Sequence, residues 1–287
     1  MNLREFLRLI RIPSLSATVI PLAAGGAAAV KSYGNLNAAL WLDMFVAALL
    51  MQIAANILNE HGDYVNRVDR SPSHGFAGSI VRGVATPHEI LGFAIAIDAA
   101  ALLLAIPLVA ARGYPILLAG LFGALVSIVY SEGPHPLSKT PFGELAVGAT
   151  MGLVEISAAQ FVAAGKVSSF ALLLSAPLSL LVASILIANN TRDIEKDRAG
   201  GRKTIEVAIG LPLSAFLFYC VVFLSYALLV VLFALTGVRG ILLPFTSLPL
   251  ALLLSLRLER SGWRLGVEYS SAIYLVFGLL LVAGMLA

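Results

Sequence analysis

The sequence predicts an all-α, polytopic membrane protein in which nine transmembrane helices form one bundle. Of the 287 residues, 59% are hydrophobic and only 12% are charged, about half the charged fraction of a typical soluble domain. The mean hydropathy is +0.93. Apolar runs close to the ~20 residues that a membrane-spanning helix needs recur along the chain, and they lack the alternation of a transmembrane barrel. These runs leave no room for a sizeable soluble domain, so we expect residues 1–287 to form a single membrane-embedded domain.

Glycines, prolines and clusters of charge divide the chain into nine predicted spans. The first span follows Arg4, Arg8 and Arg11. Its apolar core is too long for a signal peptide and further spans follow, so we expect a retained helix. The second span runs into a polar segment that begins at Asn56, and the fourth span is the shortest. In order, the predicted spans are 12–30, 40–60, 88–109, 115–130, 142–162, 168–188, 211–234, 241–258 and 270–286.

The basic residues predict the orientation of the bundle. Fifteen of the 19 Lys and Arg residues fall in the N-terminal segment and in the loops on its side, whereas each opposite loop holds one. The positive-inside rule then places the N-terminus in the cytoplasm and, with nine spans, the C-terminus outside. We expect a multi-pass protein of the cell membrane, with no need for a nucleic-acid partner. The single cysteine, Cys220, excludes an internal disulfide framework and an iron–sulfur cluster.

A first acidic motif, residues 56–69, lies at the end of the second span. Asn59 and Asp63 are spaced i, i+4, so they project from one face if the helix continues through them, with Asn56 one turn earlier. Asp69 follows in the loop. The inward loop that continues this motif is longer than the outward loops and carries both signs of charge, as binding or catalytic loops often do.

A second acidic motif, residues 189–204, lies at the end of the sixth span. Asp193 and Asp197 repeat the i, i+4 spacing, and Asn189 extends the row by one turn. The second and sixth spans run in the same direction, so both motifs are expected on one face of the membrane. A single charged cluster is most simply a solvated loop, but two clusters with the same Asn/Asp spacing on one face favour a site.

The chemistry of the two motifs indicates magnesium. Carboxylates at a helix C-terminus face the negative end of the helix dipole, which is unfavourable unless a cation offsets it. Oxygen ligands without His or Cys at matching spacing fit Mg²⁺, which binds through one or two carboxylates together with substrate phosphates. Two acidic helix ends would hold two such ions over a diphosphate and stabilise a pyrophosphate leaving group.

These motifs resemble those of the UbiA superfamily of intramembrane prenyltransferases. The similar elements are an Arg11-Ile-Pro13 opening, Asn59-Glu60-x-x-Asp63 extended to Asp69, and Asn189-Asn190-x-Arg192-Asp193-x-x-x-Asp197 followed by Gly201-Arg202-Lys203-Thr204. Within the superfamily, the ten-residue spacing from Asn59 to Asp69 and the segment from Tyr130 to Glu144 resemble the branch that prenylates 1,4-dihydroxy-2-naphthoate in menaquinone synthesis. Glu60 stands where Asp is usual, and Arg202-Lys203 reverses the common order.

The resemblance implies that a polyprenyl diphosphate loses pyrophosphate while its C1 carbon alkylates the naphthoate ring with loss of CO₂, giving demethylmenaquinol. It implies that the catalytic residues and metal ligands are Asn59, Asp63, Asp193 and Asp197. The residues expected to bind substrate are Arg11, Asn56, Glu60, Asp69, Arg82, Tyr130, Lys139, Asn189, Asn190, Arg192 and Lys203. Of these, Arg82, Lys139 and Lys203 are candidate diphosphate contacts, and Arg11 is a candidate partner of the aromatic carboxylate, with a topological anchor as its alternative.

Other interpretations stay open at this point. The acceptor would be geranylgeranylglyceryl phosphate or 4-hydroxybenzoate in other branches of the superfamily. A secondary transporter would also have many spans and buried acids, but its acids usually lie near the midplane rather than at helix ends. Two acids, Asp98 and Glu155, do fall inside predicted spans, where a functional role is the default hypothesis. We place Asp98 outside the expected site.

Overall fold

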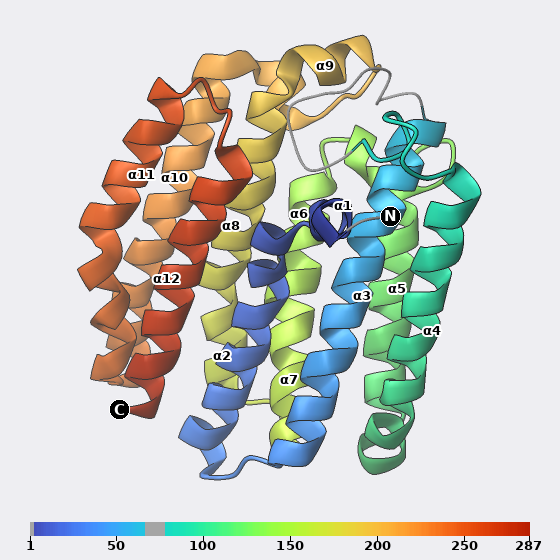
Figure 1. The fold of residues 1–287 in the computed structure, drawn as a ribbon. Coiled ribbons are helices and arrows are strands. Elements are labelled where there is room, and N and C mark those ends of the chain that lie inside the picture. Colours follow the sequence, from blue (N-terminus) through green and yellow to red (C-terminus); the bar gives the residue numbers. More distant parts are fainter. Residues whose placement is uncertain (1–2, 67–77) are drawn as a thin grey trace.

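The structure is a computed structural model of the chain that describes residues 3–66 and 78–287. All regular elements in these two ranges are helical (Figure 1). In chain order they are α1 (Leu3–Leu9), η1 (Ile12–Leu15), α2 (Ser16–Tyr33), α3 (Ala38–Val65), α4 (Pro87–Arg112), α5 (Tyr114–Ser131), η2 (Leu137–Lys139), α6 (Gly143–Val147), η3 (Gly148–Val154), α7 (Glu155–Ala164), α8 (Ser169–Arg192), α9 (Ile194–Ala199), α10 (Ile205–Thr236), η4 (Arg239–Ser247), α11 (Leu248–Arg260) and α12 (Gly266–Leu286).

Within the described ranges, nine helical segments are long and apolar enough to cross a membrane, which confirms the predicted number. Each coincides with one predicted span, including the short fourth one, and most extend beyond it. The extension matters at α3 and α8. These helices continue to Val65 and Arg192, so they carry Asn59, Asp63 and Asn189 on regular helix rather than on a loop.

Polar side chains at the helix starts explain where several spans begin. The side chains of Asn37 and Ser168 accept hydrogen bonds from the backbone N–H groups three residues later in α3 and α8. Thr86 does the same for α4 as part of a capping box with Glu89, and Thr204 caps α10. Such caps satisfy backbone donors that the first turn of a helix leaves unpaired.

The fifth span is the irregular one. It consists of α6, the π-helix η3 and α7, so its middle turns follow an i→i+5 pattern. At its inner face α7 packs against α2, and η3 packs against α8. Gly152 makes the second contact possible, since a side chain there would collide with Ser179.

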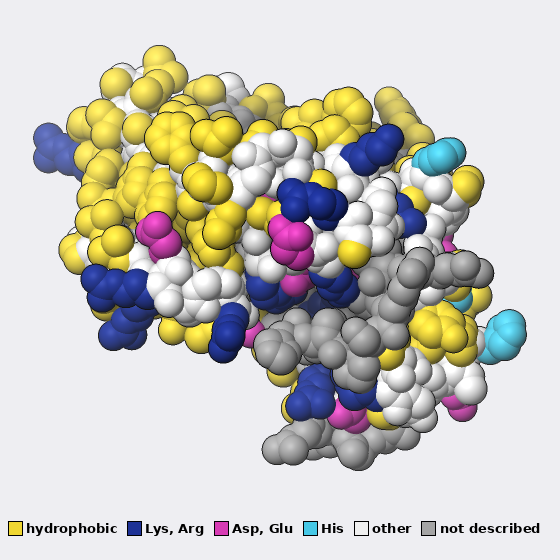
Figure 2. Space-filling view, turned by 90° about the horizontal axis from the view of Figure 1, so that it is seen from above, with side chains coloured by type: hydrophobic (Ala, Val, Ile, Leu, Met, Phe, Trp, Pro, Cys, Tyr) yellow, Lys and Arg dark blue, Asp and Glu magenta, His cyan; other side chains and the backbone are white. Residues whose placement is uncertain are grey.

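The helices form two packed groups. The main hydrophobic core joins α2, α8, α10 and α12, with Phe218, Tyr274 and Phe277 fully buried in it. A second, smaller core joins α1, α3 and α4. In Figure 1 the C-terminus lies at the end of the bundle opposite to α9. Seen from the end that carries α9, Lys, Arg, Asp and Glu side chains gather around the centre (Figure 2).

Candidate active site

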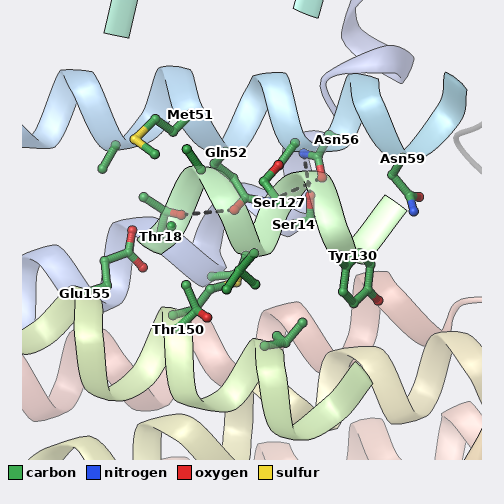
Figure 3. A pocket seen from close by; sticks show the side chains of 18 of the residues that line it. Ser14, Thr18, Met51, Gln52, Asn56, Asn59, Ser127, Tyr130, Thr150 and Glu155 are labelled. Atoms are coloured by element: carbon green, nitrogen blue, oxygen red, sulfur yellow. Dashed lines mark hydrogen bonds between the residues drawn. The ribbon is translucent and has the colours of Figure 1, made fainter. Parts of the chain in front are cut away.

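A cavity of about 590 Å³ runs between the two groups of helices. Side chains of α2, α3, α4, α5, η3, α7 and α8 line it, and most of them are apolar. Polar residues of both acidic motifs lie at one end, among them Asn59, Asp63, Asn189 and Asp193. Figure 3 shows Asn59 and Tyr130 at that end, with Glu155 and Thr18 at the other. The site is therefore a charged mouth above a mainly hydrophobic interior.

The first motif is held by hydrogen bonds to the N-terminal segment. The Asn56 side chain donates to the Ile10 carbonyl oxygen at 2.8 Å and to the Ser14 hydroxyl at 3.0 Å. Arg11 Nη1 donates to Asn59 Oδ1 at 2.7 Å. Arg11 adopts a left-handed backbone, with φ of 52°, a conformation that is costly for a residue other than glycine. These contacts bring Arg11 to the same end of the cavity as Asn59.

The second motif lies where α8 gives way to α9. Asp193, with φ of −100° and ψ of 11°, separates the two helices, yet its carbonyl oxygen still accepts from the Asp197 N–H at 2.7 Å. The i, i+4 relation expected from the sequence is therefore kept across the break. Asp197 is fully buried, and burial raises the pKa of its carboxyl to about 6, against the lowering effect of Arg202.

One arginine joins the two motifs. Arg202 Nη2 donates to Asp63 Oδ1, and Arg202 Nη1 donates to Asp197 Oδ1 at 3.1 Å. Its side chain is only 8% exposed. Burial alone would lower the pKa of Arg202, but the carboxylates of Asp63 and Asp197 outweigh it and raise that pKa. The guanidinium is thus a fixed positive charge between the motifs.

Another arginine holds the remaining carboxylate. Arg192 contacts Asp193 through two nitrogens, at 2.9 and 2.6 Å, and donates to Asn189 Oδ1 at 2.9 Å. Arg11 holds Asn59, Arg202 holds Asp63 and Asp197, and Arg192 holds Asp193. Every residue predicted to bind metal is therefore hydrogen-bonded to an arginine. The structure therefore supplies the positive charge that the acidic helix ends require.

Several residues predicted to bind substrate lie in or beside the cavity. Tyr130, at the end of α5, lines it and interacts electrostatically with Asp63 and Arg202. Asn190 also lines it, and its side-chain amide donates to Glu144 Oε1 at 2.7 Å. The predicted site residues that line the cavity are Arg11, Asn56, Asn59, Asp63, Tyr130, Asn189, Asn190, Arg192 and Asp193.

Other predicted residues face elsewhere. The buried Glu60 accepts a hydrogen bond from the Ile80 backbone N–H at 3.2 Å, and Arg82 Nη2 pairs with Glu5 Oε2 at 2.6 Å. Lys139 donates to the carbonyl oxygen of Asn66 at 3.2 Å. None of these three, nor Lys203, contributes to the described cavity lining. Asp69 lies outside the described residues.

Sequence reasoning missed two features of the site. Arg202 stood within the second motif but received no role, although a cation five residues after Asp197 was a usable signal. Asp98, which we placed outside the site, lines the cavity from α4. Its position on an otherwise apolar helix was the only signal that the sequence offered.

The donor set suits a hard cation such as Mg²⁺. Asn59, Asp63, Asp193 and Asp197 each offer side-chain oxygen atoms, the ligand type that magnesium prefers. Asp197 Oδ2 is buried and has no hydrogen-bond partner in the described part of the chain, and Asp197 is not among the residues that line the described cavity. Among the described residues, no three His, Cys, Asp or Glu side chains are gathered as a ready metal cluster.

Comparisons with known proteins agree with this architecture. A sequence model of the UbiA prenyltransferase family matches residues 18–265. The chain is 36% identical over 203 residues to 1,4-dihydroxy-2-naphthoate octaprenyltransferase of Bacillus subtilis (strain 168), covering 71% of this chain and 65% of the relative, just under two thirds of its length. It is 28% identical to human UbiA prenyltransferase domain-containing protein 1, over 95% of this chain and 80% of that one.

The fold also has solved counterparts. A UbiA homolog from Archaeoglobus fulgidus, solved bound to GPP and Mg²⁺, superposes with a TM-score of 0.67. The identity is 17%, and the match covers 97% of this chain and 99% of that chain. The shared architecture therefore extends over nearly the whole length of both proteins.

Proposed function

Because the chain belongs to the UbiA prenyltransferase family, we propose that it transfers a polyprenyl group from a polyprenyl diphosphate to 1,4-dihydroxy-2-naphthoate. The products are demethylmenaquinol, pyrophosphate and CO₂. The relative of 36% identity carries that activity in its name, which supports this acceptor. The observation that carries the proposal is a charged mouth built from two acidic motifs above a mainly hydrophobic cavity.

The two ends of the cavity match the two ends of the donor. A prenyl chain is hydrocarbon, and burying it against the alanine and leucine side chains of α3, α4 and α5 is favourable. The diphosphate is a dense anion and needs fixed cations. Arg192 and Arg202 stand at the mouth, and each already holds an oxygen of a motif residue. Arginine suits this role because its planar fork donates two parallel hydrogen bonds to a phosphate.

The metal ligands in this proposal are Asn59, Asp63, Asp193 and Asp197. Bound Mg²⁺ would supply positive charge to the pyrophosphate as its bond to C1 breaks. The chain's own contribution is to orient the diphosphate with its arginines and to keep bulk water from the allylic carbon with the apolar walls below. The new bond forms between C1 and the naphthoate ring as the bond between C1 and oxygen breaks and the carboxylate leaves as CO₂.

The proposed location is the cell membrane, with the motif end of the bundle toward the cytoplasm. Support comes from the excess of Lys and Arg in the loops at that end and from the charge gathered there in Figure 2. In this orientation both motifs and Arg202 lie on the cytoplasmic side of the membrane.

An acceptor comparison tests the proposal. Purified protein in lipid nanodiscs is given geranylgeranyl diphosphate and Mg²⁺, with dihydroxynaphthoate, 4-hydroxybenzoate or geranylgeranylglyceryl phosphate in parallel reactions. We expect prenylation of dihydroxynaphthoate with release of one pyrophosphate and one CO₂. Exclusive prenylation of 4-hydroxybenzoate or of geranylgeranylglyceryl phosphate would assign the protein the activity of another branch of the family. Absence of transfer to all three would refute the proposed activity.

A further inference from the structure

A polar layer crosses the cavity below the motif residues. On α3, Gln52 precedes Asn59 by seven residues, which is about 10 Å along the helix axis. Gln52 Oε1 accepts from Thr18 of α2 at 3.4 Å, and Gln52 Nε2 donates to Asn56 Oδ1 at 3.3 Å. Glu155, the first residue of α7, lines the cavity at the same end as Thr18. Three different helices thus contribute polar groups at one depth (Figure 3).

Two atoms of this layer lack the partners that buried polar atoms normally have. Glu155 Oε2 and Thr150 Oγ1 are both buried, and neither has a hydrogen-bond partner among the residues that the structure describes. Both side chains line the cavity. A buried polar atom without a partner costs about 1–3 kcal/mol. Such atoms in a cavity wall can be satisfied by a ligand that brings its own hydrogen-bonding group.

The local backbone explains how both side chains reach the cavity. Thr150 lies in the π-helix η3, and Glu155 follows its last residue. In a regular α-helix, positions five apart are turned about 140° from each other around the axis, whereas the wider turn of a π-helix brings them closer to one face. Single π-helical turns are frequent at functional sites. Here the irregular turn aims both groups into the same space.

The hydrocarbon chain of the donor cannot satisfy these atoms. It has neither hydrogen-bond donors nor acceptors, so a prenyl chain packed against Glu155 and Thr150 would leave their buried polar atoms without hydrogen bonds. The aromatic acceptor of the proposed reaction carries hydroxyl groups, which donate and accept hydrogen bonds. In the proposed reaction the new bond forms at the ring carbon that loses CO₂, so no proton has to leave that carbon. The carboxylate on this carbon must therefore lie near the breaking C1–O bond at the mouth, where Arg11 stands. The ring hydroxyl farther from the carboxylate then points down the cavity, away from the mouth.

We propose that Glu155 and Thr150 form the subsite that binds this distal hydroxyl of the dihydroxynaphthoate ring. The inference rests on the proposed function, since it assumes a hydroxylated aromatic acceptor. Glu155 accepts the hydrogen bond of the hydroxyl, and the Thr150 hydroxyl completes the contact. The subsite fixes the ring beneath the diphosphate and distinguishes acceptors that carry the distal hydroxyl from those that lack it.

The test combines a change in the protein with a change in the ligand. In Glu155→Leu, the KM for dihydroxynaphthoate should rise by roughly tenfold or more, the effect of losing one hydrogen bond to a carboxyl group. The KM for geranylgeranyl diphosphate should stay within about twofold. 1-Hydroxy-2-naphthoate lacks the distal hydroxyl, so its inhibition constant should differ little between wild type and variant. Glu155→Gln retains an accepting oxygen and should recover part of the loss.

Met151→Leu is the matched control, since it changes a cavity-lining side chain of the same helical segment without a polar atom. It should leave the KM for dihydroxynaphthoate unchanged. If Glu155→Leu does not fold, Thr150→Val offers the same readout with a smaller change.

Three outcomes overturn the inference. One is an unchanged KM for dihydroxynaphthoate. Another is an equal loss for both aromatic ligands, which would indicate a structural role. The third is an altered preference for prenyl chain length with an unchanged KM for the acceptor, which would indicate that the polar layer contacts the prenyl chain of the donor. Failure of the proposed function is distinct, because the wild-type protein would then not prenylate dihydroxynaphthoate at all.

Discussion

Replacing Arg202 with glutamine should make the protein depend on Mg²⁺ for stability. Arg202 is the cation that joins Asp63 of the first motif to Asp197 of the second. Both carboxylates are buried or nearly so, with side-chain exposures of 14% and 1%. The substitution keeps a hydrogen-bonding side chain of similar length but removes the charge. Two acidic helix ends then face each other without the guanidinium.

The expected size follows from the burial of the pair. Removing one partner of a buried ion pair typically costs about 3–5 kcal/mol, because the other charge stays out of water. For a chain of this size such a loss corresponds to a fall in Tm on the order of 5–10 °C in metal-free buffer. Mg²⁺ can replace the missing charge, since the carboxylate oxygens become available to it. Saturating Mg²⁺ should therefore raise the Tm of the variant by several degrees more than that of wild type.

The assay is thermal unfolding of purified wild type and Arg202→Gln in detergent, with EDTA and with a series of Mg²⁺ concentrations. Arg198→Gln is the matched control, because Arg198 is half-exposed and pairs at 2.7 Å with Glu195, which is 84% exposed. An exposed pair of this kind contributes at most about 1 kcal/mol. Arg198→Gln should thus follow wild type under all conditions.

Two results of the unfolding experiment would contradict this role of Arg202. If Arg202→Gln unfolds at the same temperature as wild type in EDTA, the guanidinium does not offset the repulsion between the motifs. If Mg²⁺ stabilises both proteins equally, Arg202 does not compete with metal for Asp63 and Asp197. Either result would contradict the expected competition between Arg202 and Mg²⁺ for Asp63 and Asp197.

Three further predictions concern the metal and the packing of the motifs. Asp63→Ala and Asp193→Ala should each abolish Mg²⁺-dependent prenyl transfer while the protein still inserts in membranes, as measured by product formation and membrane fractionation; full activity in either variant contradicts the ligand assignment. EDTA should stop transfer by wild type and added Mg²⁺ should restore it, whereas transfer that persists in EDTA excludes a metal requirement. Gly62→Val should lower the Tm by several degrees, since a side chain at Gly62 collides with the Ser131 carbonyl oxygen of α5; an unchanged Tm would show that α3 and α5 can separate at no cost.

The nine spans were predictable because the bilayer imposes one requirement on every crossing helix. Each must be apolar over about 20 residues, whatever its neighbours are. The i, i+4 rows were predictable for a similar reason, since helix geometry alone puts Asn59 and Asp63 on one face. Both inferences need only local sequence.

Glu60 shows where the prediction from motif resemblance loses detail. It follows Asn59 directly on α3, so helix geometry turns it about 100° away from the row of Asn56, Asn59 and Asp63. In the structure it accepts a hydrogen bond from Ile80 instead of lining the cavity. Position in a motif suggested a shared role, whereas the helical period separates the two side chains.

The polar layer and the Arg202 bridge were not predictable from local sequence. The layer forms only because α2, α3 and the π-helical fifth span bring Thr18, Gln52 and Glu155 to one depth. A π-helical turn has no sequence signature comparable to an apolar run. The bridge depends on the turn after α9, where the Arg202 N–H donates to the Asp197 carbonyl oxygen at 2.9 Å, and on the packing of α3 beside it.

The arginines also bear on the order in which the site is filled. In the proposed site, metal arriving alone would have to displace guanidinium groups that already pair with Asp63, Asp193 and Oδ1 of Asp197. A diphosphate arriving alone gains those guanidinium groups only by taking them from the carboxylates, whose negative charge then repels it. If both arrive, and if the metal binds the carboxylates as proposed, Arg192 and Arg202 would be freed for the phosphates, so each ligand would remove the cost that the other would meet. By linkage, the affinity of each ligand must then rise in the presence of the other by the same factor.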